Sequence, residues 1–258
     1  MPIRPPMLVL RSLLFNIAFY ANLIARLVLY VPLLAMPRPW LRAAVRDWAR
    51  SSLWLMRVIA GISVEFRGQE NIPQSGFLIA SKHQSAWETF ALFAVFPDSA
   101  YVLKRELALI PFFGWYTLKS RMIPVDRTAG AAALATMTDR VGEEIANGRQ
   151  VIIFPEGTRR PAGAPPDYKF GVVQLYHRLG VPCLPVALNS GLFWPRRSFI
   201  RRPGTIVVEF LPVIPAGLTR SKFRTLLITR IEDASDRLLA EGRAASGMPR
   251  GREAVHTA

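Results

Sequence analysis

His83 and Glu88, five positions apart in the stretch His83-Gln84-Ser85-Ala86-Trp87-Glu88, are the side chains best suited to chemistry in this chain. A carboxylate on one ring nitrogen of a histidine fixes the tautomer and makes the other nitrogen a better base. Such a base can take the proton from a hydroxyl group as it attacks a carbonyl carbon. Because residues five apart on a regular helix turn through about 500°, the pair can meet only if His83 precedes the helix.

The same stretch also matches a helix-capping pattern. Ser85 would be the N-cap residue, and Glu88 would reach back to its backbone amide. In that interpretation Glu88 serves the helix start and His83 is incidental. The local sequence leaves both duties of Glu88 open, and a Glu88 oxygen within hydrogen-bond distance of the His83 ring would decide for the first.

A second turn with chemical potential is Phe154-Pro155-Glu156-Gly157-Thr158-Arg159, which follows the apolar run 151–153. Gly157 permits a tight turn and a close backbone approach. Glu156 can accept hydrogen bonds from hydroxyl groups, and Arg159 can bind a phosphate through two parallel hydrogen bonds. Together with the histidine turn upstream, this turn favours a substrate site over an ordinary loop.

Two further stretches lie between and after these turns. Lys104 and Arg105 follow a short apolar run, where they could meet a phosphate or simply be solvated. The segment 181–189 predicts a core strand shaped by two prolines, one of them Pro185. Cys183, in the same segment, is interpreted as a packing residue. We find no metal-ligand spacing and no nucleotide-binding fingerprint in the sequence.

The elements that must position these residues alternate between short β-rich runs and helical patterns, which indicates an α/β domain with a mixed, largely parallel sheet. The predicted strands are Ile62–Phe66, Phe77–Ser81, Ala100–Leu103, Arg121–Val125, Val151–Phe154, Pro182–Leu188 and Thr205–Phe210. The predicted helices cover 86–96, 107–119, 130–147, 170–179 and 219–241. His83 therefore lies at the carboxyl end of a strand, the edge where ligands usually bind in such sheets.

The first 60 residues differ from the rest and predict a membrane-attachment element. They hold eight arginines against one acid within a chain of net charge +15, and they contain the longest apolar runs. Residues 7–36 favour a single span, an interfacial helix or a shallow hairpin. In the predicted helix 40–60, one side is formed by Trp40, Ala44, Trp48, Trp54, Leu55 and Val58. That side could face the membrane, the domain or both.

Three parts of the chain follow: a membrane-associated helical element at 1–60, an α/β domain at 61–242, and a disordered tail at 243–258. Positive charge mixed with apolar residues favours an anionic membrane surface over nucleic acid as the partner. The single cysteine excludes an internal disulfide.

Taken in order, the four stretches resemble the motifs of the glycerolipid acyltransferase family, most closely its bacterial 1-acyl-glycerol-3-phosphate (lysophosphatidate) acyltransferases. The resemblance covers about residues 60–215, and the apolar, basic N-terminus also fits. His83 matches the catalytic histidine, and Glu88 stands where the family usually has aspartate. The resemblance links Lys104, Arg105 and Arg127 to the substrate phosphate, Glu156, Gly157 and Arg159 to the acylglycerol phosphate, and Pro185 to the acyl-donor side.

The resemblance implies transfer of a fatty acyl group to the sn-2 hydroxyl of lysophosphatidate, which gives phosphatidate for phospholipid biosynthesis. The implied co-substrate is acyl-CoA or acyl-carrier protein, with no cofactor, no metal and no covalent intermediate. Backbone amides of the histidine turn and helix start would stabilise the oxyanion. The implied location is the cytoplasmic face of a bacterial inner membrane, among anionic lipids.

Two alternatives remain at this stage. One is a related O-acyltransferase whose acceptor is another lyso-phospholipid or a lyso-aminolipid, because the motifs report the chemistry but not the headgroup. The other is a non-catalytic membrane-surface protein whose basic face is its whole function. Consumption of a thioester that depends on an acceptor would exclude the second.

Overall fold

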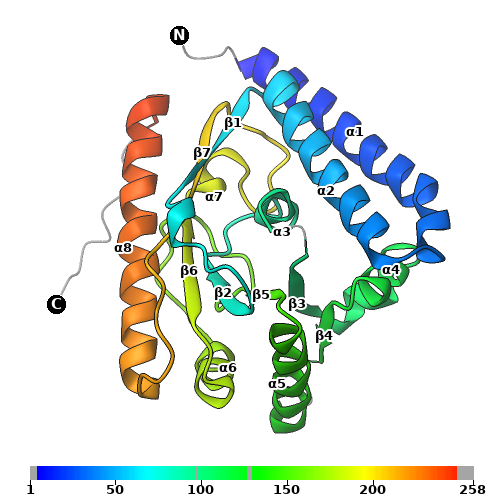
Figure 1. Ribbon diagram of the computed structural model, residues 1–258. Coiled ribbons are helices and arrows are strands. Elements are labelled where there is room, and N and C mark those ends of the chain that lie inside the picture. Colours follow the sequence, from blue (N-terminus) through cyan, green and yellow to red (C-terminus); the bar gives the residue numbers. More distant parts are fainter. Residues whose placement is uncertain (1–4, 97, 127–129, 249–258) are drawn as a thin grey trace.

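The computed structural model describes residues 5–96, 98–126 and 130–248, and within them seven strands form one sheet (Figure 1). The strands are β1 (Ile62–Arg67), β2 (Phe77–Ser81), β3 (Ala100–Lys104), β4 (Ile123–Val125), β5 (Gln150–Ile153), β6 (Cys183–Leu188) and β7 (Gly204–Phe210). Their order across the sheet is β1-β7-β6-β2-β5-β3-β4. Only β6 and β7 pair antiparallel among these neighbours. The predicted α/β fold with a mixed, largely parallel sheet is confirmed.

The strand order explains why distant stretches of the sequence meet. Strands β6, β2, β5, β3 and β4 run in the same direction, so their carboxyl ends share one edge. β2 lies between β5 and β6. The His83 turn, which follows β2, is therefore flanked by the Glu156 turn after β5 and by Ser190 after β6.

Helices cover both faces of the sheet because side chains alternate between the faces along each strand. Phe77 and Ile79 of β2 belong to the core on one face, and Leu78 and Ala80 belong to the core on the other. The first face is covered by α1 (Pro5–Leu29), α2 (Arg38–Leu55), the π-helical turn Met56–Ala60, α3 (Glu88–Ala91) and α7 (Ser190–Phe193). The second is covered by α5 (Gly130–Ala146), α6 (Gly171–Leu179) and α8 (Arg220–Ser246), as Figure 1 shows.

Short helical turns complete the chain, and two of them differ from the predicted helices. The predicted helix 86–96 is α3 followed by the 3₁₀ turn Leu92–Ala94. The predicted helix 107–119 is the 3₁₀ turn Arg105–Leu109 followed by α4 (Phe113–Lys119). Pro111 separates these two pieces, since proline lacks the amide that a continuous helix needs. Two more 3₁₀ turns are Val31–Leu34 and Gln69–Asn71.

α1 is long and apolar enough to cross a membrane, and 22% of its apolar window is buried in the protein. Its buried residues are Ser12, Phe15, Asn16 and Phe19. The Asn16 amide donates to the carbonyl of Phe199, at 3.0 Å. Large apolar side chains fill the exposed side of the helix, from Met7 to Leu29. α1 and α2 form a helical hairpin (Figure 1). The shallow hairpin predicted within residues 7–36 is not formed, because α1 is unbroken from Pro5 to Leu29.

The apolar side predicted for the helix 40–60 is divided between the domain and the outside. Trp40, Trp54 and Val58 are each more than half exposed. Trp48 packs against the core, and α2 buries Leu41, Ala44, Ala49 and Ser52. Small residues let α2 approach the domain closely, and two of its tryptophans are left outside.

α8 runs to Ser246, past residue 242, where the predicted tail begins. Its N-cap is Thr219, whose hydroxyl accepts from the amide of Lys222. The long helix packs along β6 and β7, so it reaches from the far end of the sheet back to the His83 edge.

Candidate active site

His83 and Glu88 meet in the turn between β2 and α3. The Nδ1 atom of His83 lies 2.9 Å from Oε1 of Glu88. Glu88 is the first residue of α3, and His83 precedes the helix, which is the geometry that the five-residue spacing requires. A carboxylate can only accept, so Nδ1 carries a proton, and in the neutral imidazole Nε2 is then the nitrogen with the free lone pair. The pair therefore presents a basic nitrogen at the sheet edge.

Glu88 performs both of the duties that its sequence left open. The same Oε1 atom accepts from the backbone amides of Gln84 and Ser85, each at 2.7 Å. The other oxygen, Oε2, accepts from the hydroxyl of Ser190 at 2.9 Å. The carboxylate is fully buried, and its four hydrogen bonds hold it in one orientation. Glu88 closes the turn before α3 and contacts the His83 ring at the same time.

Four amides of the turn and helix start, the region expected to stabilise an oxyanion, are engaged by side chains. The amide of His83 donates to Glu156 at 2.9 Å, and those of Gln84 and Ser85 donate to Glu88. The amide of Trp87 donates to the hydroxyl of Ser85 at 3.1 Å. Because an N–H group has one proton to give, these amides cannot also bind an oxyanion.

A buried ion cluster lies beneath the histidine turn. Lys82 is 2% exposed, and its ammonium lies 3.0 Å from Oε1 of Glu156 and 2.7 Å from Oε1 of Glu232. The hydroxyl of Tyr168 donates to Glu232 at 2.6 Å. Burial raises the pKa of Glu156, and Lys82 and the His83 amide act in the opposite direction. The cluster thus ties α8 and the Glu156 turn to the backbone of His83.

Glu156 holds the two turns together from a buried position. It is fully buried, and its oxygens contact Lys82 and the His83 amide. It also lines the large cavity in front of His83, so its contact with a substrate hydroxyl group stays a prediction. Gly157 next to it has φ of +67°, a conformation that glycine adopts without strain. The amide of Arg160 donates to the carbonyl of His83 at 2.7 Å, so the two turns are joined on both sides.

The face of the His83 ring packs on an aromatic wall. Its ring stacks on that of Phe154, with centroids 4.0 Å apart and an interplanar angle of 17°. Tyr101 lies behind Phe154 at 6.1 Å, and burial raises the pKa of its hydroxyl. These contacts restrict rotation of the imidazole, so the ring and its carboxylate form a preorganised pair.

A cavity of about 1060 Å³ opens in front of His83. One wall comes from the N-terminal hairpin and includes Leu23, Leu27 and Trp48. The opposite walls come from α3, β3, α4 and α5, where most side chains are apolar. This cavity is large enough for a long aliphatic chain and offers it few polar contacts.

Cations lie at the mouth of the same cavity. Lys104 and Arg159 both line it, and no carboxylate in the described part of the chain forms an ion pair with either. Arg105 is not among the lining residues, and its guanidinium pairs with Asp126 at 3.2 Å. The structure therefore brings Lys104 and Arg159 to His83, and it turns Arg105 away. Arg127 lies outside the described residues.

The fourth motif lies inside the sheet. Pro185 is buried in β6, where its carbonyl accepts from Leu211 at 3.0 Å, and it is not among the described residues that line the cavity. Cys183 is fully buried in the same strand, and burial raises the pKa of its thiol. The structure gives Cys183 the packing position that was predicted.

Sequence reasoning missed Lys82, Ser190, Glu232 and Tyr168. Lys82 carried a signal, because it joins a fully apolar strand to the histidine turn and a lysine there is rarely buried without partners. Ser190 and Glu232 carried none. They lie 102 and 150 positions from the residues they contact, and only the sheet order brings them near.

Comparisons with known proteins agree with this geometry. The family model described as Acyltransferase matches residues 63–189. A 1-acyl-sn-glycerol-3-phosphate acyltransferase of Pseudomonas aeruginosa is 43% identical over 175 residues, which cover 68% of this chain and 68% of that protein. One of Saccharomyces cerevisiae is 28% identical over 179 residues, which cover 67% of this chain and 59% of that protein.

The fold has also been observed before. The crystal structure of the 1-acyl-sn-glycerophosphate acyltransferase PlsC from Thermotoga maritima matches with a TM-score of 0.73 at 21% identity, and the match covers 90% of this chain and 98% of that one. The family match at 63–189 includes both the His83 turn and the Glu156 turn. With that match and a 43% identical relative aligned over two thirds of both chains, this chain belongs to the acyltransferase family.

Proposed function

We propose that this acyltransferase transfers a fatty acyl group from a thioester carrier to the sn-2 hydroxyl of 1-acyl-glycerol-3-phosphate, giving phosphatidate. The names of the relatives from Pseudomonas aeruginosa and Saccharomyces cerevisiae support this reaction. The observation that carries it is the contact of 2.9 Å between His83 Nδ1 and Glu88 at the mouth of a cavity with apolar walls and unpaired cations.

His83 acts as the general base. Its Nε2 atom takes the proton from the sn-2 hydroxyl while that oxygen attacks the carbonyl carbon of the thioester. The carbon–sulfur bond then breaks, the new ester is released, and the thiolate sulfur takes the proton back from the imidazolium. Glu88 holds the ring and stabilises its positive charge between these steps. No bond forms between the acyl group and the protein.

Lys104 and Arg159 bind the phosphate of the acceptor. In lysophosphatidate the phosphate is attached to the carbon next to the one that carries the free hydroxyl. A phosphate held at the cavity mouth by Lys104 and Arg159 therefore keeps that hydroxyl near His83. The apolar walls take up aliphatic chain, whose burial contributes about 0.8 kcal/mol for each methylene group.

The hairpin of α1 and α2 places the reaction at a lipid surface. Its exposed apolar side chains and its arginines suit insertion into the interface of an anionic membrane. Because CoA and acyl-carrier protein are carriers of the cytoplasm, this surface is the cytoplasmic face of the membrane. The acceptor already resides there, so only the acyl donor must arrive from solution.

Acyl transfer by His83→Ala tests the proposal. We expect loss of thiol release from palmitoyl-CoA in the presence of 1-oleoyl-glycerol-3-phosphate, by at least about 100-fold, with an unchanged circular dichroism spectrum. The matched control is His177→Ala, because His177 is an exposed histidine of α6 that does not line the cavity in front of His83. Wild-type turnover by a folded His83→Ala protein would overturn the proposal.

The acceptor is tested separately with a panel of lyso-lipids and one donor. The unpaired Lys104 and Arg159 favour a terminal phosphate, so lysophosphatidate should be used with the highest kcat/KM. Lyso-phosphatidylethanolamine, lyso-phosphatidylglycerol and a lyso-aminolipid are the competitors. If any of these gave a higher kcat/KM, it would take the place of lysophosphatidate as the proposed acceptor. The proposed role of His83 would not change.

A further inference from the structure

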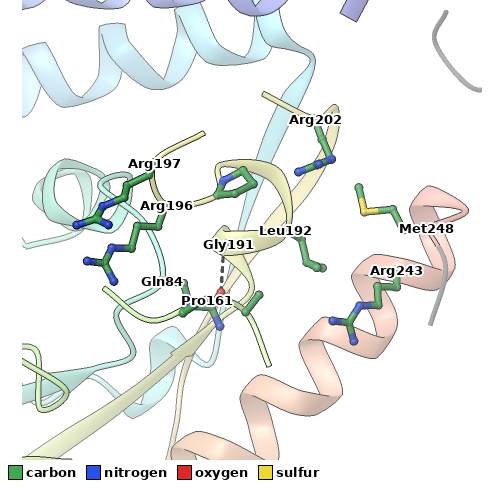
Figure 2. A pocket seen from close by; sticks show the side chains of 11 residues that line it. Gln84, Pro161, Gly191, Leu192, Arg196, Arg197, Arg202, Arg243 and Met248 are labelled. Atoms are coloured by element: carbon green, nitrogen blue, oxygen red, sulfur yellow. Dashed lines mark hydrogen bonds between the residues drawn. The ribbon is translucent and has the colours of Figure 1, made fainter. Parts of the chain in front are cut away.

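A second pocket has a volume of about 630 Å³, and Figure 2 shows the residues that line it. Gln84, the residue after His83, and Gly191, the residue after Ser190, form part of its wall. The amide of Gly191 donates to Oε1 of Gln84 at 2.9 Å, which fixes the side chain of Gln84. The pocket is therefore built on the same backbone segments as the active site.

Four arginines line this pocket, and we call it the arginine pocket. Arg196 and Arg197 follow α7, Arg202 precedes β7, and Arg243 lies in α8. Figure 2 shows them arising from separate segments around the Gln84–Gly191 contact. No carboxylate in residues 5–96, 98–126 or 130–248 forms an ion pair with any of the four, although the chain pairs many of its other arginines.

The arginine pocket also contains buried donors that lack partners. Gln84 is fully buried, and its Nε2 atom has no hydrogen-bond partner in the described structure. The same holds for Nε of Arg196. A buried amide without an acceptor is unfavourable in the free protein, and a ligand oxygen would satisfy it. Donors from guanidinium and amide groups, together with the absence of paired acids, suit a ligand that offers only acceptor oxygens, as phosphate does.

Arg196 connects the arginine pocket to the active-site cavity. It lines both, and its guanidinium donates to the carbonyl of Arg159 at 2.8 Å. Arg196 is thus shared by the walls of the arginine pocket and of the cavity that holds His83. The acceptor phosphate does not fit this position, because it lies next to the reacting hydroxyl and must stay on the Lys104 side. The ligand needs phosphates that are separated from the reacting carbon by a long arm.

We infer that the arginine pocket binds the phosphate groups of the acyl donor, an inference that rests on the proposed acyl transfer. In both acyl-CoA and acyl-carrier protein, the thioester sulfur ends a long pantetheine arm whose other end carries a phosphate. CoA adds a second phosphate in its pyrophosphate and a third on the ribose. The arm passes Arg196 and delivers the thioester to His83, while the phosphates stay behind the turn.

The test removes charge from the pocket and phosphate from the donor in the same experiment. The variant is Arg202→Ala/Arg243→Ala, since neither residue lines the active-site cavity. The donors are palmitoyl-CoA, palmitoyl-phosphopantetheine and palmitoyl-pantetheine, which carry successively fewer phosphates. The control is Arg224→Ala, because Arg224 is an exposed arginine of α8 outside both cavities.

We expect the double variant to lower kcat/KM for palmitoyl-CoA by about tenfold or more and to leave kcat/KM for palmitoyl-pantetheine unchanged. The wild-type preference for phosphorylated donors should shrink accordingly, which is the signature of a direct interaction in a double-mutant cycle. The KM for lysophosphatidate should stay within about twofold, and Arg224→Ala should match the wild type. An equal loss with all three donors, or a loss confined to lysophosphatidate, would overturn the inference.

The source of the phosphate is resolved by comparing palmitoyl-CoA with palmitoyl-carrier protein. An effect on both assigns the pocket to the phosphopantetheine phosphate that they share, and an effect on CoA alone assigns it to the nucleotide phosphates. A double variant that keeps its donor kinetics but loses binding to phosphatidylglycerol vesicles would overturn the inference in favour of a lipid headgroup.

A binding measurement separates this inference from the proposed function. Calorimetric titration of free CoA into His83→Ala protein requires no turnover, and the Arg202→Ala/Arg243→Ala changes should raise the Kd about tenfold or more there too. If CoA binds in this manner but no lyso-lipid is acylated by the wild type, the proposed function fails. If lysophosphatidate is acylated but the Arg202→Ala/Arg243→Ala changes leave the Kd for CoA unchanged, the inference about the arginine pocket fails and the proposed function stands.

Discussion

Oε1 of Glu88 lies 2.9 Å from Nδ1 of His83 while the same oxygen closes the turn in front of α3. Capping and orientation are therefore one interaction in this protein and not two competing ones. The backbone amides that Glu88 accepts from belong to the residues directly after His83. Any movement of the start of α3 would move His83. The contacts that hold the turn rigid therefore also hold the active site rigid.

Glu88→Gln separates the charge of this residue from its shape. The amide oxygen can still accept from Nδ1 and the turn amides, but a neutral group cannot stabilise the imidazolium that forms during transfer. We expect kcat to fall by about 100-fold or more, with little change in either KM. Ser190→Ala, which removes one hydrogen bond from Glu88, should reduce kcat by less than about tenfold. Full turnover by a folded Glu88→Gln protein would show that the carboxylate serves the fold alone.

Arg159→Ala should raise the KM for lysophosphatidate by about tenfold or more, because a charge-assisted contact to phosphate is lost. The KM for palmitoyl-CoA should change by less than about twofold. Arg160→Ala is the neighbouring control, since its side chain contacts the carbonyl of Pro165 and lies outside the cavity. Initial rates with each substrate varied in turn measure both constants. Equal increases in the two KM values would remove Arg159 from the phosphate site.

We predict that the effect of Glu156→Gln on the free energy of unfolding depends on pH. Burial raises the pKa of Glu156 above its ordinary value of 4.5, so the native state holds this proton more tightly than the unfolded state does. The stabilisation that this proton gives the native state is fully present at pH values below the ordinary pKa. It is lost as the pH rises through the raised pKa. The free energy of unfolding of the wild type should therefore decline relative to Glu156→Gln over this range and then level off.

Urea unfolding in detergent between about pH 4 and 8 measures this difference. Glu143→Gln is the control, because the side chain of Glu143 is 64% exposed, and its difference from the wild type should stay nearly flat. A difference that grows in favour of the wild type with rising pH would mean that the Lys82 ion pair outweighs burial at Glu156.

Cys183 should be unreactive in the native protein. It is fully buried, and burial raises the pKa of its thiol, so little of the nucleophilic thiolate exists near neutral pH. We expect no reaction with a disulfide reagent until denaturant is added, and then one thiol for each chain. The same reagent can therefore follow CoA release during turnover. Rapid labelling of folded protein would contradict the buried position in β6.

The exposed side of α1 should determine membrane binding. Ile17→Glu/Ile24→Glu places two charges on side chains that are 59% and 60% exposed, so the domain should fold unchanged. Co-sedimentation with phosphatidylglycerol vesicles should fall by about tenfold or more. Ala132→Glu/Thr136→Glu adds the same charge to exposed positions of α5 and should have a smaller effect. Equal losses would attribute binding to net charge and not to the α1 surface.

The local sequence determined the elements and the turns that carry chemistry. The runs 77–81 and 151–154 gave the bounds of β2 and placed β5 within one residue, and the spacing of His83 and Glu88 required the histidine to precede a helix. These features depend on residues that are neighbours in the chain, so periodicity and turn composition report them directly.

Tertiary structure decided everything that depends on strand order. Ser190 reaches Glu88, and Glu232 reaches Lys82, only because β6 and β5 flank β2 and α8 returns along the sheet. No local pattern encodes such contacts, because they join residues more than a hundred positions apart.

The same reason explains the face of α2 and the arginine pocket. Periodicity grouped the tryptophans of α2 on one side but left open whether that side faces the domain, and the packing of small residues on the domain decided it. Arg202 and Arg243 come together from separate segments, and nothing in their local sequence distinguishes them from solvated arginines. The sequence by itself thus determined which residues could do chemistry, and the packing of the parallel strands decided which of them meet.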